Sequence, residues 1–89
     1  MVRVTVFFSG RVQGVGFRFT AYEIAKSHLV GGTVENLEDG RVKIIVEGEP
    51  DEVDRFVASV QESMAGKIKK MERFSSEPSR EFNGFSIRR

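Results

Sequence analysis

The sequence predicts an α+β fold in which two helices cover one face of an antiparallel sheet. Segments in which every second residue is apolar, typical of strands, and segments with apolar residues three or four positions apart, typical of helices, follow one another in the order β-α-β-β-α-β, with a short terminal strand. An Asp39-Gly40 pair lies between the second and third strand segments, as in a tight hairpin. With right-handed crossovers, this order is that of a ferredoxin-like split βαβ sandwich.

The first strand and the first helix follow from two apolar periods near the N-terminus. Val2 to Phe8 alternates, with apolar residues on one face, which predicts a half-buried strand. From Phe17 to His28 or Leu29, apolar residues recur at helical spacing and predict a helix of about three turns. We expect Gly31-Gly32 to end this helix, because glycine is common just past a helix C-terminus.

The middle of the chain predicts a hairpin followed by a second helix. Thr33 to Leu37 and Arg41 to Gly48 have the composition of strands, and Glu38-Asp39-Gly40 joins them. The second helix begins at Glu49-Pro50, since proline suits the first helical position, and ends at Gly66. Its apolar residues keep helical spacing throughout: Val53, Phe56, Val57, Val60 and Met64.

Two further strands complete the predicted sheet. Lys67 to Phe74 is rich in basic residues, which discourage pairing with other chains and therefore indicate an edge strand. After a loop over Ser75 to Glu81, Phe82 to Arg88 predicts a short closing strand with Phe85 and Ile87 on one face.

The composition indicates one small domain spanning residues 1–89 and excludes several classes of site. The absence of cysteine excludes disulfides, thiolate metal sites and a cysteine nucleophile, and the single His28 excludes a histidine-rich metal site. A net charge of +1 gives little attraction to nucleic acid or membranes, and no apolar run is long enough to span a membrane. We expect a cytoplasmic protein without a metal or cofactor.

The stretch from Ser9 to Arg18 connects the first strand to the first helix and contains Gly10, Gly14 and Gly16. Glycine permits backbone conformations in which several N–H groups face one point, so such a loop at a helix N-terminus can cradle an anion. Arg18, in the first helical turn, could bind a phosphate through two parallel hydrogen bonds. Spacing alone leaves a purely structural turn equally open, and no Gly-Lys-Ser/Thr follows the glycines, which excludes a Walker A loop.

Asn36 is the candidate for a second part of this site. It lies one residue before the predicted strand gives way to the hairpin turn, at an end of the sheet that need not be far from the glycine loop. Asparagine is common beside turns for local reasons. Together with the glycine loop, however, Asn36 becomes a candidate for orienting a nucleophile.

Two stretches of the chain resemble the two signatures of acylphosphatases. Phe8 to Arg18, which reads FSGRVQGVGFR, is similar to the first signature. Gly32 to Asn36, followed by Asp39-Gly40-Arg41-Val42 and by Gly48, is similar to the second. The resemblance covers essentially the whole chain, including the closing Phe85 to Arg88.

The resemblance implies hydrolysis of the carboxyl–phosphate bond of acyl phosphates to a carboxylate and inorganic phosphate, without a metal, a cofactor or a phosphoenzyme. It implies that Arg18 and the loop amides bind the phosphoryl group and that Asn36 positions the attacking water. The implied phosphate-binding residues are Gln13, Gly14, Val15, Gly16, Phe17 and Arg18. The implied partner is a small acyl phosphate, and we expect a monomer that binds neither nucleic acid nor membrane.

The available residues agree with such a reaction. With no cysteine, no paired histidines and no obvious carboxylate pair, the chain offers little for a covalent or metal mechanism. An acyl phosphate is a mixed anhydride whose carboxylate leaves without protonation, so catalysis reduces to positioning and charge stabilisation. We hypothesise that the phosphate itself accepts the proton of the water.

Two residues depart from the pattern of the family. Thr33 stands where the family usually has a larger apolar or aromatic residue, and Glu35 stands where a basic or neutral residue is common. If strand alternation holds, Val34 and Asn36 share a face and Glu35 points away from it. If the strand ends early, Glu35 would repel an anionic substrate and raise KM. These departures bear on catalytic efficiency.

Three alternatives remain open. An RNA-recognition module has the same order of elements, but the strand from Arg41 to Gly48 has no aromatic residue on which a base could stack. An anion-binding or regulatory domain without turnover would keep the glycine loop, and the intact Arg18 and Asn36 argue against it. Phe7 and Ile45, on the less protected face of the sheet, could support a dimer.

Overall fold

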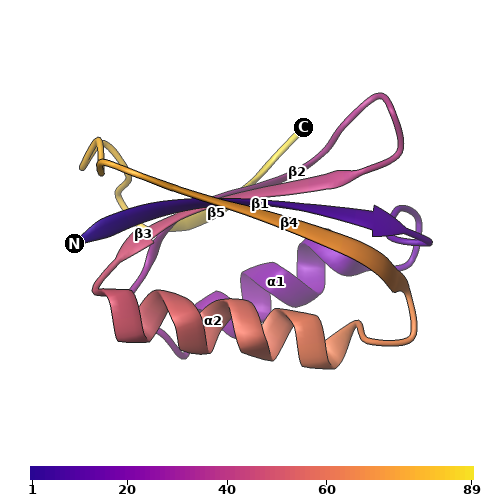
Figure 1. Ribbon diagram of the computed structural model, residues 1–89, viewed down its shortest axis with the longest axis horizontal. Helices are drawn as coiled ribbons and strands as arrows, with labels where there is room; N and C mark the ends of the chain where they lie inside the picture. The colour runs from indigo at the N-terminus through magenta and orange to yellow at the C-terminus, as the bar shows by residue number, and fades with distance from the viewer.

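Two helices lie on one face of a five-stranded sheet in the computed structural model, which describes residues 1–89 (Figure 1). The elements are β1 (Val2–Gly10), α1 (Phe17–Ala25), β2 (Gly31–Asn36), β3 (Val42–Gly48), α2 (Pro50–Ser63), β4 (Ile68–Ser76) and β5 (Phe85–Arg88). The predicted α+β, ferredoxin-like sandwich is therefore confirmed. Neither helix is long and apolar enough to cross a membrane.

The strand order in the sheet is β4-β1-β3-β2-β5. The first four strands pair antiparallel, whereas β5 runs parallel to β2. The sheet is thus mixed, and the expectation of an antiparallel sheet was wrong for its last strand. The physical reason is that β4 ends at the same end of the sheet where β2 begins, so the chain re-enters beside β2 in the direction of β2. The lysine-rich β4 lies at an edge, as predicted.

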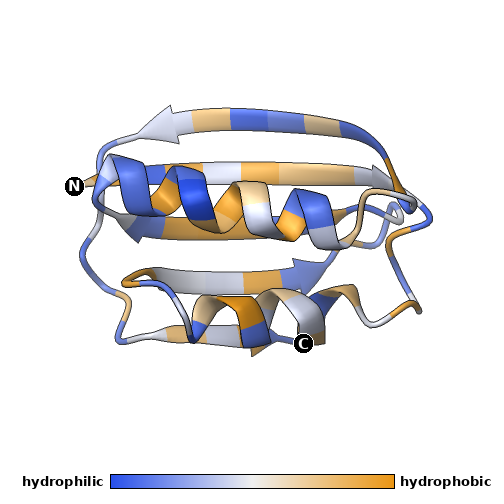
Figure 2. Ribbon diagram, turned by 90° about the horizontal axis from the view of Figure 1, so that it is seen from below, coloured by the Kyte–Doolittle hydropathy of each residue, from blue (hydrophilic) through white to orange (hydrophobic).

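The core lies between the helices and the sheet. Sixteen buried apolar side chains form one cluster, to which β1 contributes Val4, Val6 and Phe8 from a single face, as the alternation predicts. Hydrophobic and hydrophilic bands alternate along α2 in Figure 2, because only one side of this helix packs on the sheet. The two elements that border the glycine loop, β1 and α1, are thereby anchored in the core.

The first helix is shorter than predicted, and Gly31-Gly32 does not end it. α1 ends at Ala25, where the next three N–H groups bond to carbonyls three residues back and tighten the final turn. Gly31 and Gly32 belong to β2 instead. A Cβ on Gly32 would lie 1.9 Å from the carbonyl oxygen of Ile45 on β3, so this glycine permits a close approach of two strands.

The hairpin between β2 and β3 has the predicted turn. The Leu37 N–H donates to the Arg41 carbonyl (2.8 Å), and the Gly40 N–H donates to the Leu37 carbonyl (3.2 Å). The Asp39 carboxylate accepts hydrogen bonds from the backbone N–H of Arg41 (3.1 Å) and from its Nε (2.9 Å). These bonds fix where β2 ends and therefore where Asn36 lies.

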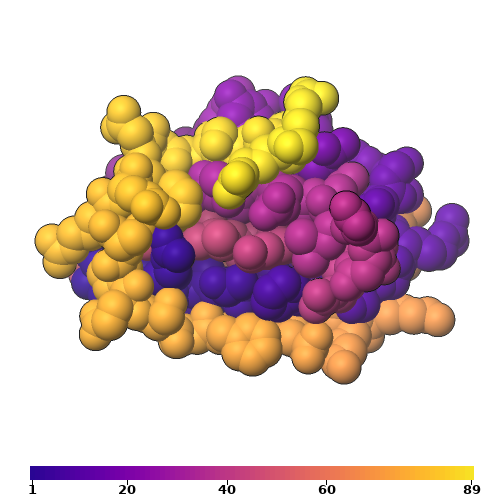
Figure 3. All heavy atoms as spheres, turned by 90° about the horizontal axis from the view of Figure 1, so that it is seen from above, coloured from indigo at the N-terminus to yellow at the C-terminus, as the bar shows by residue number.

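On the sheet face opposite the helices, a buried carboxylate ties the connection between β4 and β5 to the sheet. Glu47, only 3% exposed, accepts hydrogen bonds from Arg3 Nε (2.8 Å) and from the backbone N–H groups of Ser79 (2.7 Å) and Arg80 (2.9 Å). Burial alone would raise the pKa of Glu47, but these hydrogen bonds outweigh burial and lower the pKa to about 2. We call these four residues the Glu47 clamp; Figure 3 shows the connection that it holds folded over the end of the sheet.

Candidate active site

The loop from Arg11 to Gly16 leaves β1 and enters α1 with a backbone that favours glycine. Gly14 and Gly16 have φ angles of 73° and 80°, in the left-handed region that residues with a Cβ rarely adopt. Gly16 is the N-cap of α1, so no side chain caps this helix, and its first turn contains no acidic residue. By contrast, Pro50 and Asp51 occupy the first turn of α2. The first N–H groups of α1 are therefore open to an anion.

Gln13 fixes the glycine loop to the β2–β3 hairpin. Its Nε2 donates hydrogen bonds to the carbonyl oxygens of Leu37 (2.7 Å) and Arg41 (2.9 Å), the two residues that close the hairpin. Because Asn36 directly precedes Leu37, these bonds hold the loop and Asn36 at a set separation. Gln13 thus joins the two halves of the site that the sequence could only place near one another.

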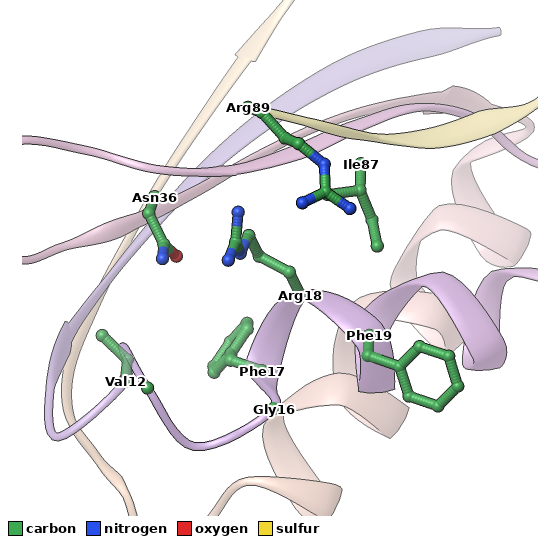
Figure 4. A pocket seen from close by; sticks show the side chains of 9 residues that line it. Val12, Gly16, Phe17, Arg18, Phe19, Asn36, Ile87 and Arg89 are labelled. Atoms are coloured by element: carbon green, nitrogen blue, oxygen red, sulfur yellow. The ribbon is translucent and has the colours of Figure 1, made fainter.

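One pocket, of about 230 Å³, opens between the glycine loop, α1 and the ends of β2 and β5 (Figure 4). It is lined by Val12, Gly14, Gly16, Phe17, Arg18, Phe19, Asn36, Ile87 and Arg89. Five of the residues expected to form the site therefore lie together here: Gly14, Gly16, Phe17, Arg18 and Asn36. Gln13 and Val15 do not line the pocket; Gln13 bonds to the hairpin, and Val15 packs against the core. Contact of their amides with a phosphate stays a prediction.

Arg18 and Asn36 face the same space without partners of their own. Figure 4 shows the Arg18 guanidinium and the Asn36 amide turned toward the pocket from α1 and β2. Arg18 is half-buried, yet it forms no ion pair and no side-chain hydrogen bond within the chain. Asn36 Oδ1 is the one buried side-chain polar atom that lacks a hydrogen-bond partner. The pocket therefore offers both a donor cluster and an acceptor to a ligand.

The two departures from the family pattern lie outside the pocket. β2 continues through Asn36, so the alternation holds: Val34 is buried in the core and Asn36 lines the pocket. Glu35 is not among the lining residues, and Thr33 is buried at a position opposite Ile45 of β3. Glu35 is therefore not placed to repel a bound anion directly.

Sequence reasoning missed four lining residues: Val12, Phe19, Ile87 and Arg89. The signal for Arg89 was present, because Phe85 and Ile87 were expected on one face and alternation carries that face two residues further to Arg89. Val12 is fully buried within the loop, and loop residues have no period from which burial could be read.

The charges that line the pocket are all positive. Arg18 and Arg89 have its only ionisable side chains, so no carboxylate or imidazole side chain lines it. Nowhere in the molecule do three or more His, Cys, Asp or Glu side chains gather in a way that could hold a metal ion. The arrangement can bind a small anion and present a hydrogen-bond acceptor beside it.

Comparison with known proteins gives one consistent family. The sequence profile of the family described as Acylphosphatase matches residues 4–87. An acylphosphatase from Roseiflexus sp. (strain RS-1) is 41% identical over 88 residues, which cover 98% of this chain and 95% of that protein. The crystal structure of acylphosphatase from Bacillus subtilis superposes with a TM-score of 0.89 at 31% identity and covers 100% of both chains. HypF from T. kodakarensis is similar to all of this chain (TM-score 0.84, 28% identity) over 12% of its own length.

Proposed function

Because the chain belongs to the acylphosphatase family, we propose that this pocket is its active site, where Arg18 and the amides of the loop from Gln13 to Arg18 hold a phosphoryl group and Asn36 orients the attacking water. The activity is that of an acylphosphatase, and the family acts on small acyl phosphates. The assignment of Arg18, Asn36 and the loop amides to the steps of that reaction is the proposal.

One observation carries the assignment: the buried Asn36 Oδ1 has no hydrogen-bond donor, and it faces a half-buried Arg18 that has no anion. A buried polar group without a partner costs about 1–3 kcal/mol, so such a group is retained where a ligand supplies the partner. Arg18 can donate hydrogen bonds to an anion, and Asn36 Oδ1 can accept one from a donor. A bound phosphoryl group with a water molecule beside it supplies both partners.

The charge and size of the pocket suit a phosphoryl group with a small substituent. A phosphoryl group carries a charge of about −1.5 to −2 at neutral pH. The Arg18 guanidinium and the N-terminus of α1, which contributes about half a positive charge, balance most of it. The volume of about 230 Å³ is below the roughly 300–1,000 Å³ of pockets for drug-sized ligands, which favours a small substrate.

The proposed step is a direct displacement at phosphorus. The oxygen of the water held by Asn36 attacks phosphorus, and the bond from phosphorus to the acyl oxygen breaks with its electron pair on the departing carboxylate. The proton of the water passes to a phosphoryl oxygen, since no carboxylate or imidazole side chain lines the pocket to accept it. Arg18 and the loop N–H groups stabilise the charge on the equatorial oxygens.

Hydrolysis of benzoyl phosphate in EDTA tests these roles in the wild type, Arg18→Ala, Asn36→Ala and Arg11→Ala. We expect Arg18→Ala to lower kcat/KM by on the order of 10²–10³, or about 3–4 kcal/mol, and to weaken competitive inhibition by inorganic phosphate. Asn36→Ala should lower kcat with a smaller effect on phosphate inhibition. Arg11 is exposed and does not line the pocket, so Arg11→Ala controls for loss of a positive charge nearby.

Two results would contradict the proposal. A folded wild type that binds phosphate but leaves benzoyl phosphate intact would be an anion-binding domain, the alternative that the sequence left open. An Asn36→Ala variant with wild-type kcat would remove the water-orienting role while leaving the phosphate site in place.

We also propose that residues 1–89 form one domain that acts as a monomer. The glycine loop, α1, β2 and β5 of a single chain together bring the basic and amide groups of the proposed site into one pocket. Light scattering at assay concentration should give a mass near 10.0 kDa, and a mass twice as large would instead favour pairing through the face of Phe7 and Ile45.

A further inference from the structure

The pocket contains a second guanidinium that the proposed reaction does not use. Arg89 lines the pocket with Arg18 and Asn36 and, like Arg18, forms no ion pair or side-chain hydrogen bond within the chain. In Figure 4 its side chain leaves the end of β5 and turns toward the space that Arg18 also faces. The adjacent Arg88 does not line the pocket.

Strand pairing brings Arg89 to the end of the sheet where Asn36 lies. β5 runs parallel to β2 with Arg88, its last residue, opposite Glu35, and Arg89 follows directly after this pair, as Asn36 follows Glu35. Alternation turns Arg89 toward the helix-covered face, the face on which Ile87 packs against the core. Arg89 thus lies directly after the last paired residue of β5, where its side chain reaches the pocket.

Charge balance leaves Arg89 available for a second anion. Arg18 and the N-terminus of α1 already balance most of the charge of a phosphoryl group on the glycine loop. The guanidinium of Arg89 pairs with no side chain of the protein, and most of its charge exceeds what is left to balance on the phosphoryl group. Because the phosphoryl group is the deeper part of the substrate in this arrangement, the excess charge faces the acyl part.

The surroundings of Arg89 support this placement. Arg89 is exposed, whereas Arg18 is half-buried, so Arg89 lies nearer the mouth of the pocket. Two apolar side chains share this side: Phe19, which is 61% exposed, and the half-buried Ile87. The mouth thus combines an apolar surface for a carbon skeleton with a guanidinium, and guanidinium groups bind carboxylates and phosphates through paired hydrogen bonds.

We propose that Arg89 is a specificity-determining residue that binds a second anionic group on the acyl part of the substrate. The enzyme then prefers acyl phosphates whose acyl group carries a carboxylate or a phosphate-type group over those whose acyl group is neutral. This inference rests on the proposed function of the pocket. The second anion does not change during the reaction, so Arg89 contributes to KM more than to kcat.

Substrates matched in shape test the preference. We would compare benzoyl phosphate with para-carboxybenzoyl phosphate and para-phosphonobenzoyl phosphate in the wild type, Arg89→Gln, Arg89→Lys and Arg88→Gln. We expect the wild type to favour a charged substrate by on the order of tenfold in kcat/KM at low salt, through KM. Arg89→Gln should lose this preference for the charged substrate, Arg89→Lys should keep part of it, and Arg88→Gln should keep all of it. The better of the two charged substrates identifies the group as carboxylate or phosphate-like.

A binding measurement separates this inference from the proposed function. Phenacylphosphonate, in which CH₂ replaces the bridging oxygen, and its para-carboxy and para-phosphono derivatives are titrated calorimetrically into the same variants. If the wild type binds a charged analogue more tightly, loses the preference in Arg89→Gln and yet hydrolyses no benzoyl substrate, the role of Arg89 stands and the catalytic proposal fails. If the wild type hydrolyses benzoyl phosphate but Arg89→Gln keeps the wild-type ratios, the role of Arg89 is wrong. A protein that neither binds nor hydrolyses these compounds overturns both.

Discussion

The two arginine clusters at opposite ends of the sheet differ in where their partners come from. In the Glu47 clamp, Arg3 donates hydrogen bonds to Glu47 and to Ser79 Oγ, each at 2.8 Å. The backbone N–H groups of Ser79 and Arg80 also donate to the Glu47 carboxylate. In the pocket, Arg18 has no acceptor and Asn36 Oδ1 has no donor. The same fold therefore contains one polar cluster that is satisfied internally and one that is not.

The difference indicates which cluster holds the fold together and which one has polar groups free to bind a ligand. The clamp attaches the connection between β4 and β5 to the sheet, and this connection leads into the strand that carries Arg89. The pocket leaves polar groups unpaired, which lowers stability but preorganises them for charge that arrives with a substrate. Glu47 thus serves the stability of the fold, whereas the roles that we propose for Arg18 and Asn36 are in binding and catalysis.

The largest expected effect is a difference in stability between a variant of the clamp and a variant of the pocket. We expect Glu47→Ala to lower the free energy of unfolding by about 3–4 kcal/mol, because Arg3 and two backbone N–H groups lose their acceptor. Arg18→Ala should change it by less than about 0.5 kcal/mol, since no internal partner is lost. Urea unfolding of both variants measures these values.

The milder Arg3→Met variant provides a control for this comparison. It keeps the aliphatic stem but removes the guanidinium, and it should cost about 2 kcal/mol because Glu47 keeps its two backbone donors. Folded Glu47→Ala and Arg3→Met should keep most of the wild-type kcat for benzoyl phosphate. Equal losses of stability in Glu47→Ala and Arg18→Ala would show that the two clusters do not differ as described.

The clamp should make the stability of the fold depend on pH. The pKa of Glu47 is about 2 in the folded protein against an ordinary 4.5, so its stabilising contribution is complete above about pH 4.5 and is lost as the pH falls toward about 2. This contribution amounts to up to about 3 kcal/mol. The difference in unfolding free energy between the wild type and Glu47→Gln, measured across this range, should shrink as the pH falls. A difference that stays constant would mean that Glu47 titrates normally in the folded state.

Local sequence patterns predicted the order of the helices and strands and the two parts of the candidate site, the glycine loop with Arg18 and Asn36. These features depend on residues that are neighbours in the sequence. Alternation in β1 and helical spacing in α2 reflect burial on one side, and the glycines before Arg18 reflect backbone conformation. Asn36 could be placed on the correct face because β2 alternates up to its last residue. Each of these features requires only knowledge of the adjacent residues.

What the sequence did not predict depends on which strand lies beside which. Alternation gives the face of Arg89, but the direction of β5 and its place beside β2, which bring Arg89 to the end of the sheet where Asn36 lies, follow from strand pairing. The pairing of Arg3 with Glu47 requires the register of β1 against β3. Gly31-Gly32 resembled a helix stop, because the close approach to Ile45 that requires glycine comes from a strand distant in sequence.

The smallest expected effect comes from a substitution in the glycine loop. It tests whether the backbone N–H groups of this loop, as well as the Arg18 side chain, bind the phosphate. Gly16→Ala meets no atom within 4 Å, but its φ of 80° strains an alanine by about 1–2 kcal/mol, so the strain can be relieved by moving the first N–H groups of α1. We expect a loss of about 1 kcal/mol in unfolding free energy, together with a weaker inhibition by inorganic phosphate. Gly66→Ala also meets no atom within 4 Å and has no positive φ, so it should leave both quantities unchanged. If Gly16→Ala loses stability but binds phosphate as the wild type does, the loop amides do not hold the anion and Arg18 alone must do so.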